Sequence, residues 1–158
     1  ALLIAYASID ILASLDPPEP RASTRRRFVA WVDRYLLPNS ELPCNGLDLY
    51  AARCAVVHTA GSQSHLERHG EARRIVYALG HSSAEELHSS IKTLGNPSRD
   101  IAVHVEAVLN AFERSVWLFR SAILQDATLR DRVHRNSSRF FPGVSFGAGF
   151  SILDIRMA

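Results

Sequence analysis

The most regular stretch of the chain is Ile101–Ile123, IAVHVEAVLNAFERSVWLFRSAI, and it decides the predicted fold. Its apolar residues recur at steps of four and three, which is the spacing of one face of an α-helix. This stripe consists of Ile101, Val105, Val108, Phe112, Val116, Phe119 and Ile123. The other faces carry Glu106, Asn110, Glu113 and Arg120. We therefore predict one continuous amphipathic helix of about seven turns.

Local signals on both sides of this stretch predict further helices. A helix over residues 1–15 ends at Asp16-Pro17-Pro18, because proline cannot continue a helix. Serines at 82–83 followed by glutamates at 85–86 form a capping-box pattern, which predicts a helix running to about Leu94. The remaining predicted helices cover residues 24–37, 47–59 and 127–137.

Three segments lack a helical pattern. Residues 61–70 are polar and predicted to be irregular, whereas residues 72–79 fit a short strand or a helical turn. The glycine-rich residues 140–155 fit a hairpin or an extended chain. We therefore predict a single all-α domain over residues 1–158. It is a small bundle of about five to six helices with an irregular or hairpin-like C-terminal tail.

The composition is that of a globular protein and argues against general disorder. Of 158 residues, 47% are apolar and 22% are charged. A formal charge of +2 permits binding to a phosphate backbone but does not require it. All the basic residues except Lys92 are arginines. Arginine suits bidentate phosphate contacts, although a GC-rich coding sequence gives the same bias.

Other residues indicate the compartment and argue against a metal. Cys44 and Cys54 form no CxxC pair, so two free thiols in a reducing, cytoplasmic setting are expected. The apolar residues 1–15 are too short to span a bilayer, and no membrane association is predicted. His65 and His69 have the spacing of a metal-binding pair, but no third ligand is evident. We therefore predict no metal and no other cofactor.

The candidate chemical site lies in the segment 48–59, DLYAARCAVVHT, which places His58 five positions after Arg53. This pair, followed by a small residue and a glycine, resembles the Arg-x4-6-His signature of the HEPN superfamily. These small helical bundles include many RNA-cleaving toxins and effector nucleases. The resemblance implies a metal-independent endoribonuclease that works as a homodimer, with two motifs facing one cleft. It also implies possible partners, namely an antitoxin or, for a nucleotide-binding member, a nucleotidyltransferase.

The chemistry of RNA cleavage gives both residues a role. Attack by the RNA's own 2′-hydroxyl needs proton transfer, which a histidine performs near neutral pH. The dianionic phosphorane needs a cation such as an arginine fork, so no metal is required. On an ideal α-helix, however, positions five apart diverge by about 140°, so the helix must end near His58. Arg25, Arg26 and Tyr50 are the candidate substrate-binding residues.

Two alternatives remain open. Arg99 and His104 repeat the spacing, and Asp100 supplies the polar residue that usually follows the arginine in the family, where the first pair has Cys54. Because the long helix is predicted to hold His104 in its interior, we prefer Arg53 and His58 as the catalytic pair. The other alternative concerns the whole chain. It is a non-catalytic helical module that binds itself or another protein through the apolar stripe and the tail.

Overall fold

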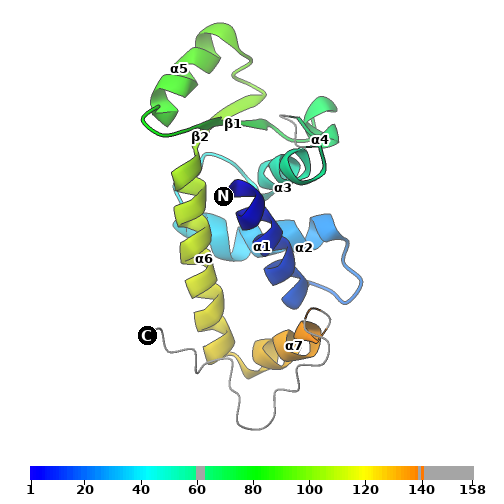
Figure 1. Cartoon of the computed structure of the whole chain (residues 1–158). Helices are drawn as coiled ribbons and strands as arrows, with labels where there is room; N and C mark the ends of the chain where they lie inside the picture. Colours follow the sequence, from blue (N-terminus) through cyan, green and yellow to red (C-terminus); the bar gives the residue numbers. More distant parts are fainter. Residues whose placement is uncertain (60–62, 139, 141–158) are drawn as a thin grey trace.

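The computed structural model describes residues 1–59, 63–138 and 140, which form a mostly helical protein with one small sheet (Figure 1). The α-helices are α1 (Leu2–Leu15), α2 (Thr24–Trp31), α3 (Gly46–Cys54), α4 (His65–Arg68), α5 (Ala84–Leu94), α6 (Val105–Gln125) and α7 (Ala127–Ser137). Two helices continue into other helical turns: the π-helical η1 (Val32–Leu36) and the 3-10 η2 (Leu37–Asn39) after α2, and the π-helical η3 (Ala55–Thr59) after α3. The strands are β1 (Arg74–Ala78) and β2 (Asp100–His104).

The predicted helices outside the long stripe are confirmed. They correspond to α1, to α2 with η1, to α3 with η3, to α5 and to α7. Side-chain caps fix where these helices begin, because the first backbone N–H groups of a helix have no partner within it. Ser23 accepts a hydrogen bond from the backbone N–H of Arg26 at the start of α2. Ser83 and Glu86 form the predicted capping box at the start of α5.

The predicted all-α fold is wrong in one region, because residues 74–104 form a β–α–β unit. β1 and β2 pair in parallel, with Ile75 opposite Ile101 and Tyr77 opposite Val103. Residues 72–79 therefore contain a strand, and the long helix begins at Val105 instead of Ile101. The physical reason is that a short apolar run fits a strand and a helix equally well by periodicity. Ile101 lies four residues before Val105 and so continues the apolar spacing, although it belongs to β2 and not to the helix.

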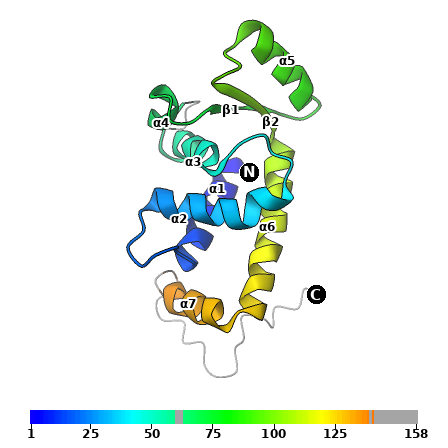
Figure 2. The same cartoon turned by 180° about the vertical axis from the view of Figure 1, so that it is seen from behind.

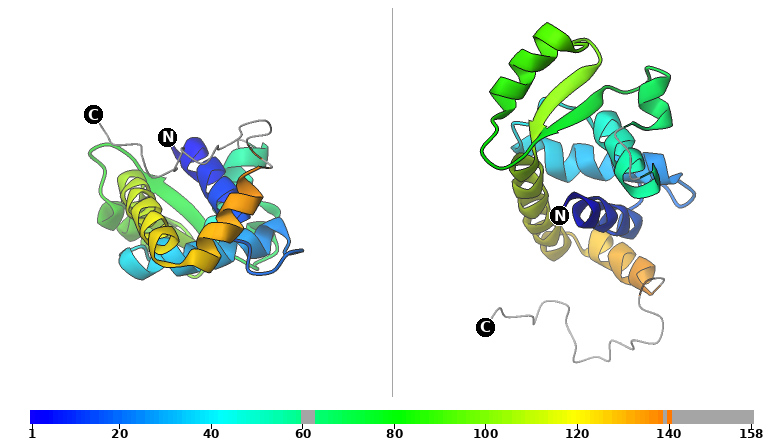
Figure 3. Two further views of the ribbon diagram at one scale, coloured as in Figure 1. Left: turned by 90° about the horizontal axis from the view of Figure 1, so that it is seen from below. Right: turned by 45° about the horizontal axis from the view of Figure 1, so that its top comes forward.

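The small sheet is covered on both faces. On the inner face, Ile75, Ile101 and Val103 join the main core. On the other face the small residues Ala78 and Ala102 are buried, and α5 packs against the strands there (Figure 3). Such two-sided cover is typical of parallel strands, which are connected by helices lying on the sheet.

The helix α6 connects the two ends of the molecule, with β2 at its start and α7 after its end (Figures 1 and 2). The ring of Phe119 on α6 contacts those of Trp31 and Tyr35, with centroids 5.9 and 5.0 Å apart. α1 packs against this body through Tyr6 and Ile9, both fully buried. Burial of these large side chains supplies most of the stabilisation of the fold.

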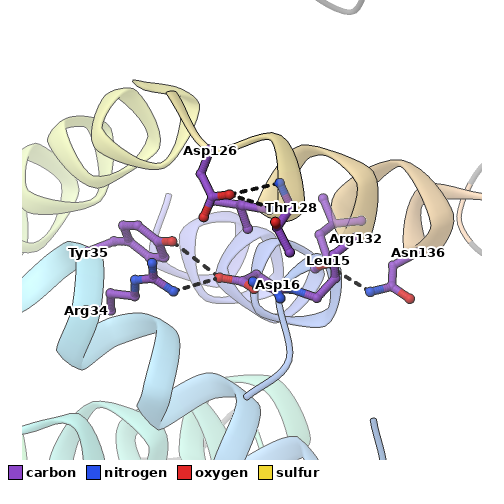
Figure 4. Close-up of polar contacts among 9 residues, drawn as sticks. Leu15, Asp16, Arg34, Tyr35, Asp126, Thr128, Arg132 and Asn136 are labelled. Carbon is purple, nitrogen blue, oxygen red and sulfur yellow. Dashed lines mark hydrogen bonds and ion pairs between the residues drawn. The ribbon is translucent and has the colours of Figure 1, made fainter. Parts of the chain in front are cut away.

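A buried carboxylate holds the end of α1. Asp16 Oδ1 accepts a hydrogen bond from Arg132 Nε (2.7 Å) and lies 2.6 Å from Arg132 Nη2 in an ion pair. Its Oδ2 accepts from Arg34 and Tyr35, each at 3.3 Å (Figure 4). These contacts join α1 to η1 and α7. Both carboxylate oxygens therefore have partners, as a buried charge requires.

Two segments complete the comparison with the predictions. The prediction that residues 61–70 are irregular is wrong for α4, because Ser64 and Glu67 form a capping box that starts this short helix. Residues 60–62 lie outside the described residues, as does most of the glycine-rich tail, residues 141–158.

Among the described residues, no helix has the length and apolar character needed to cross a membrane.

Candidate functional site

The first residue of the candidate pair, Arg53, lies in the last turn of α3 and points to α1 rather than into solvent. Its Nε and Nη2 both donate to one oxygen of Asp10, at 2.7 and 2.5 Å. The arginine is 8% exposed. Asp10 lies on α1, where Ile9 and Ala13 are buried in the core. The guanidinium is therefore held in one orientation by a rigid element.

The electrostatics of this pair favour a charged arginine. Burial by itself lowers the pKa of Arg53, but the hydrogen bonds and the charge of Asp10 outweigh it, so the pKa lies above its usual value. A guanidinium is in any case protonated at every pH of interest. Arg53 thus provides a permanent positive charge close to the surface of the α3–η3 helix.

The second residue, His58, lies in η3, where the helix widens from α to π geometry. The α-helical part ends at Cys54, but the helix itself does not end there, because the π-helical turn continues it through His58 to Thr59. The side chain of His58 and residues 60–62 lie outside the described residues. The pairing of the two side chains therefore remains a prediction.

Tyr50 precedes Arg53 by almost one helical turn and is half-buried. The guanidinium carbon of Arg53 is 5.9 Å from the centroid of its ring. On its other side the ring meets Phe28 edge-on, with centroids 5.5 Å apart. Burial, followed by the neighbouring Cys54 thiol, raises the pKa of Tyr50. The phenol is therefore a neutral hydrogen-bonding group beside the arginine at physiological pH.

A cavity of about 260 Å³ opens beside α3 and η3, between them and β1. It is lined by Ala52, Ala55, Val56, Glu67, Arg74, Ile75, Val76 and Tyr77. Most of this lining is apolar, and the buried Glu67 accepts the backbone N–H of Ser64 at 2.5 Å. The cavity has room for a small, mostly apolar group, and Arg53 is not among its lining residues.

The predicted substrate-binding arginines lie at the start of α2 and are occupied by surface carboxylates. Arg25 Nη1 is 3.2 Å from Glu71 Oε2, and Arg26 pairs with Glu19. Both pairs are exposed, so each contributes little to stability and exchanges readily for another anion. The structure thus brings Arg53 and Tyr50 together, while Arg25 and Arg26 lie on the neighbouring α2.

The alternative pair, Arg99 and His104, lies at the two ends of a strand. β2 separates the two residues, and a strand of this length spans roughly 16 Å. Arg99 Nη2 donates to the backbone carbonyl of Glu67, whereas His104 ends β2 and accepts the Glu106 N–H as the cap of α6. The prediction that His104 lies inside a helix is wrong, because the helix begins after it. Both residues instead complete backbone hydrogen bonding.

The two histidines with metal-like spacing lie against each other in and after α4. The rings of His65 and His69 are 4.0 Å apart, tilted by 34°. Among the described residues, no group of three or more histidine, cysteine, aspartate or glutamate side chains has the geometry to hold a metal ion. Cys44 and Cys54 are both free thiols. Burial raises the pKa of Cys44 to about 12, so this thiol is inert at neutral pH.

The residue that the sequence analysis missed is Asp10. It is the one charged residue in the apolar stretch 1–15. A lone carboxylate in an apolar helix must find a cation or remain in solvent. That signal identifies Asp10 as a paired residue, but periodicity alone does not reveal which arginine it pairs with.

Comparisons with protein-family models, with curated proteins and with solved structures find no match. The function is therefore argued from the residues of this chain and from their geometry.

Proposed function

We propose that this protein is a metal-independent endoribonuclease of the HEPN type, with Arg53 and His58 as its catalytic pair. The observation that carries the proposal is the fixed, buried Arg53 at the point where α3 widens into the π-helical η3. Such π-helical turns occur frequently at functional sites. An arginine held from behind by a carboxylate is also pre-organised for a phosphate, because no reorientation is needed when charge develops.

The proposed reaction is the internal transfer of the RNA phosphate. The 2′-oxygen attacks phosphorus while the bond from phosphorus to the 5′-oxygen breaks, giving a 2′,3′-cyclic phosphate and a 5′-hydroxyl. His58 takes the proton of the 2′-hydroxyl, and the histidine of a second copy protonates the leaving oxygen. Arg53, whose side chain is 10% exposed, stabilises the negative charge on the phosphorane. A homodimer in which two motifs face one cleft supplies both histidines.

The remaining contacts to RNA are proposed for Arg25, Arg26 and Tyr50. Arg25 and Arg26 lie in exposed ion pairs, which a phosphate replaces at little cost in free energy. The ring of Tyr50 lies beside Arg53, and its phenol can donate to the same phosphate or to a ribose. The apolar cavity beside η3 is suited to the flat face of a base.

Cleavage of RNA by the purified protein in EDTA tests this proposal. We expect cleavage that persists without metal and disappears in Arg53→Ala and His58→Ala variants. Arg99→Ala and His104→Ala variants are matched controls, because they remove the same two residue types at the same spacing. Loss of activity in the second pair alone would transfer the site to β2. A well-folded wild-type protein that cleaves no RNA would refute the nuclease proposal.

One observation favours a second function, that of a non-catalytic interaction module. α1 carries an exposed apolar stripe in which Leu3 is 53%, Ile4 71% and Ile11 43% exposed. A helix that is apolar on all sides normally has all its sides covered. Under this proposal α1 binds a second copy or a protein partner such as an antitoxin. Sedimentation velocity of the wild-type protein and of an Ile4→Asp variant distinguishes a stable dimer from a monomer.

A further inference from the structure

We infer that Asp10 is a positioning residue for the proposed cleavage reaction and acts through Arg53. The inference rests on the nuclease function proposed above and extends it to a residue on a different helix. Asp10 lies 43 positions before Arg53, so only the packing of α1 against η3 and the end of α3 brings the two together. It does not touch the RNA. Its role is to fix the plane of the guanidinium.

The geometry of the contact supports this role. Both Nε and Nη2 of Arg53 bond to Asp10 Oδ2, at 2.7 and 2.5 Å, so the carboxylate holds the guanidinium along one side. A guanidinium is rigid and planar, and fixing two of its nitrogens fixes the directions of all its N–H bonds. We call this contact of one carboxylate oxygen with Nε and Nη2 of an arginine a clamp. Asp10 itself is also fixed in place, because Ile9 and Ala13 on the same helix are buried in the core.

A purely structural ion pair would be built differently, as the other end of α1 shows. Asp16 uses one oxygen for Arg132 in the same Nε and Nη2 arrangement, and its second oxygen for Arg34 and Tyr35. Asp10 Oδ1, in contrast, is buried and has no hydrogen-bond partner among the described residues. Unpaired buried oxygens are rare, and they are often associated with a functional role. The Asp10 pair is therefore optimised for orienting the arginine rather than for saturating the carboxylate.

The same contact explains how a buried arginine keeps one orientation. Without Asp10 the guanidinium would lie in an apolar environment without a counter-charge, and it would turn towards solvent. With Asp10 it stays against α1. Misplacing a catalytic group by about 1 Å can slow a reaction by roughly 100-fold, so a small rotation of the guanidinium is enough to affect the rate.

The test compares Asp10→Asn and Asp10→Glu with the matched control Asp16→Asn, which removes the same charge from the same kind of clamp. Single-turnover cleavage of a short RNA is measured in EDTA, together with the Nε–H signal of Arg53 by NMR. In Asp10→Asn we expect cleavage to slow by about 100-fold at saturating RNA, with little change in RNA affinity. The Arg53 signal, protected from exchange in the wild type, should be lost. Asp10→Glu should recover part of the rate, since it restores the charge.

Asp16→Asn should cleave at the wild-type rate once folded, although it is less stable. The inference is overturned if Asp10→Asn keeps the wild-type rate, or if Asp16→Asn loses the same activity, because the effect would then be general destabilisation. It is also overturned if wild-type Arg53 shows no protected signal. If the wild type shows that signal and cleaves no RNA, the clamp exists but the proposed nuclease function has failed.

Discussion

Asp10 in α1 and Asp16, directly after the last residue of α1, make nearly the same contact with an arginine but differ in how many of their oxygens have partners. Asp10 and Asp16 each bind an arginine through Nε and Nη2 on a single oxygen. The second oxygen of Asp16 is also occupied, and its network ties α1 to η1 and α7 (Figure 4). The second oxygen of Asp10 is unpaired among the described residues. The complete network of Asp16 is assigned to stability, whereas Asp10 is the one that we propose to position a catalytic arginine.

The largest difference between the two clamps is expected for their arginines. Arg53→Ala removes the proposed phosphate ligand and should reduce RNA cleavage by about 100- to 1000-fold. Arg132→Ala should leave cleavage within about twofold, although it breaks a buried ion pair. Cleavage rates normalised to folded protein check this prediction. Equal loss of activity in both variants would show that the two clamps do not differ in function.

The next effect concerns stability. Asp16→Ala leaves Arg34, Tyr35 and Arg132 without their common acceptor, and we expect the free energy of unfolding to fall by about 3 kcal/mol. Asp10→Ala should cost less, about 2 kcal/mol, because it also removes an unpaired buried oxygen. Urea unfolding followed by circular dichroism measures both values. A larger loss for Asp10→Ala would contradict the assignment of the Asp16 network as the structural one.

The pH dependence of stability adds a test at the Asp16 end. Burial, followed by the charge of Asp16, raises the pKa of Tyr35 to about 12. In the unfolded chain a tyrosine titrates near 10, so between these values the unfolded state loses a proton that the folded state keeps. The stability therefore falls as the pH rises from about 10 to 12, by up to about 1 kcal/mol per pH unit.

A Tyr35→Phe variant isolates this contribution, because Cys44 and Tyr77 have raised pKa values as well and add to the same trend. The slope of unfolding free energy against pH should be smaller in Tyr35→Phe than in the wild type. Urea unfolding at several pH values between 9 and 12 provides the comparison. Identical slopes would mean that Tyr35 does not keep its proton in the folded state.

The smallest effect on the fold is expected on the exposed face of α1, away from both clamps. Ile4 is 71% exposed, and Ile4→Asp should change the free energy of unfolding by no more than about 0.5 kcal/mol. If the stripe of Leu3, Ile4 and Ile11 binds a second copy, the same change should convert a dimer into a monomer. Sedimentation velocity measures the mass. A monomeric wild type would exclude this stripe as a self-association surface.

Much of the fold could be predicted because its signals are local. Proline at 17 and 18 ends α1, and the Ser83–Glu86 capping box starts α5, without help from the rest of the chain. The β–α–β unit could not be predicted. The residues of β2 continue the apolar spacing of α6, and the alternative of strand or helix at 72–79 depends on a pairing partner 26 positions away.

The candidate site also has parts that could be predicted from the sequence and parts that could not. Arg53 and His58 could be proposed from their spacing, because the chemistry of a side chain can be read from the sequence alone. The place of Arg99 and His104 at opposite ends of a strand could not be foreseen while β2 was taken for helix. Asp10 was visible only as a charge in an apolar helix, because its partner is set by the packing of two helices.

The sequence by itself determined the helical class, the ends of most helices and the residue types available for chemistry. These follow from periodicity, from proline and from capping side chains, which act within a few residues. Only the tertiary structure decided that β1 pairs with β2 and that Asp10 holds Arg53 while Asp16 holds Arg132. A strand needs a partner strand, and a buried charge needs a counter-charge. Both lie far away in the sequence, so only the packed chain identifies them.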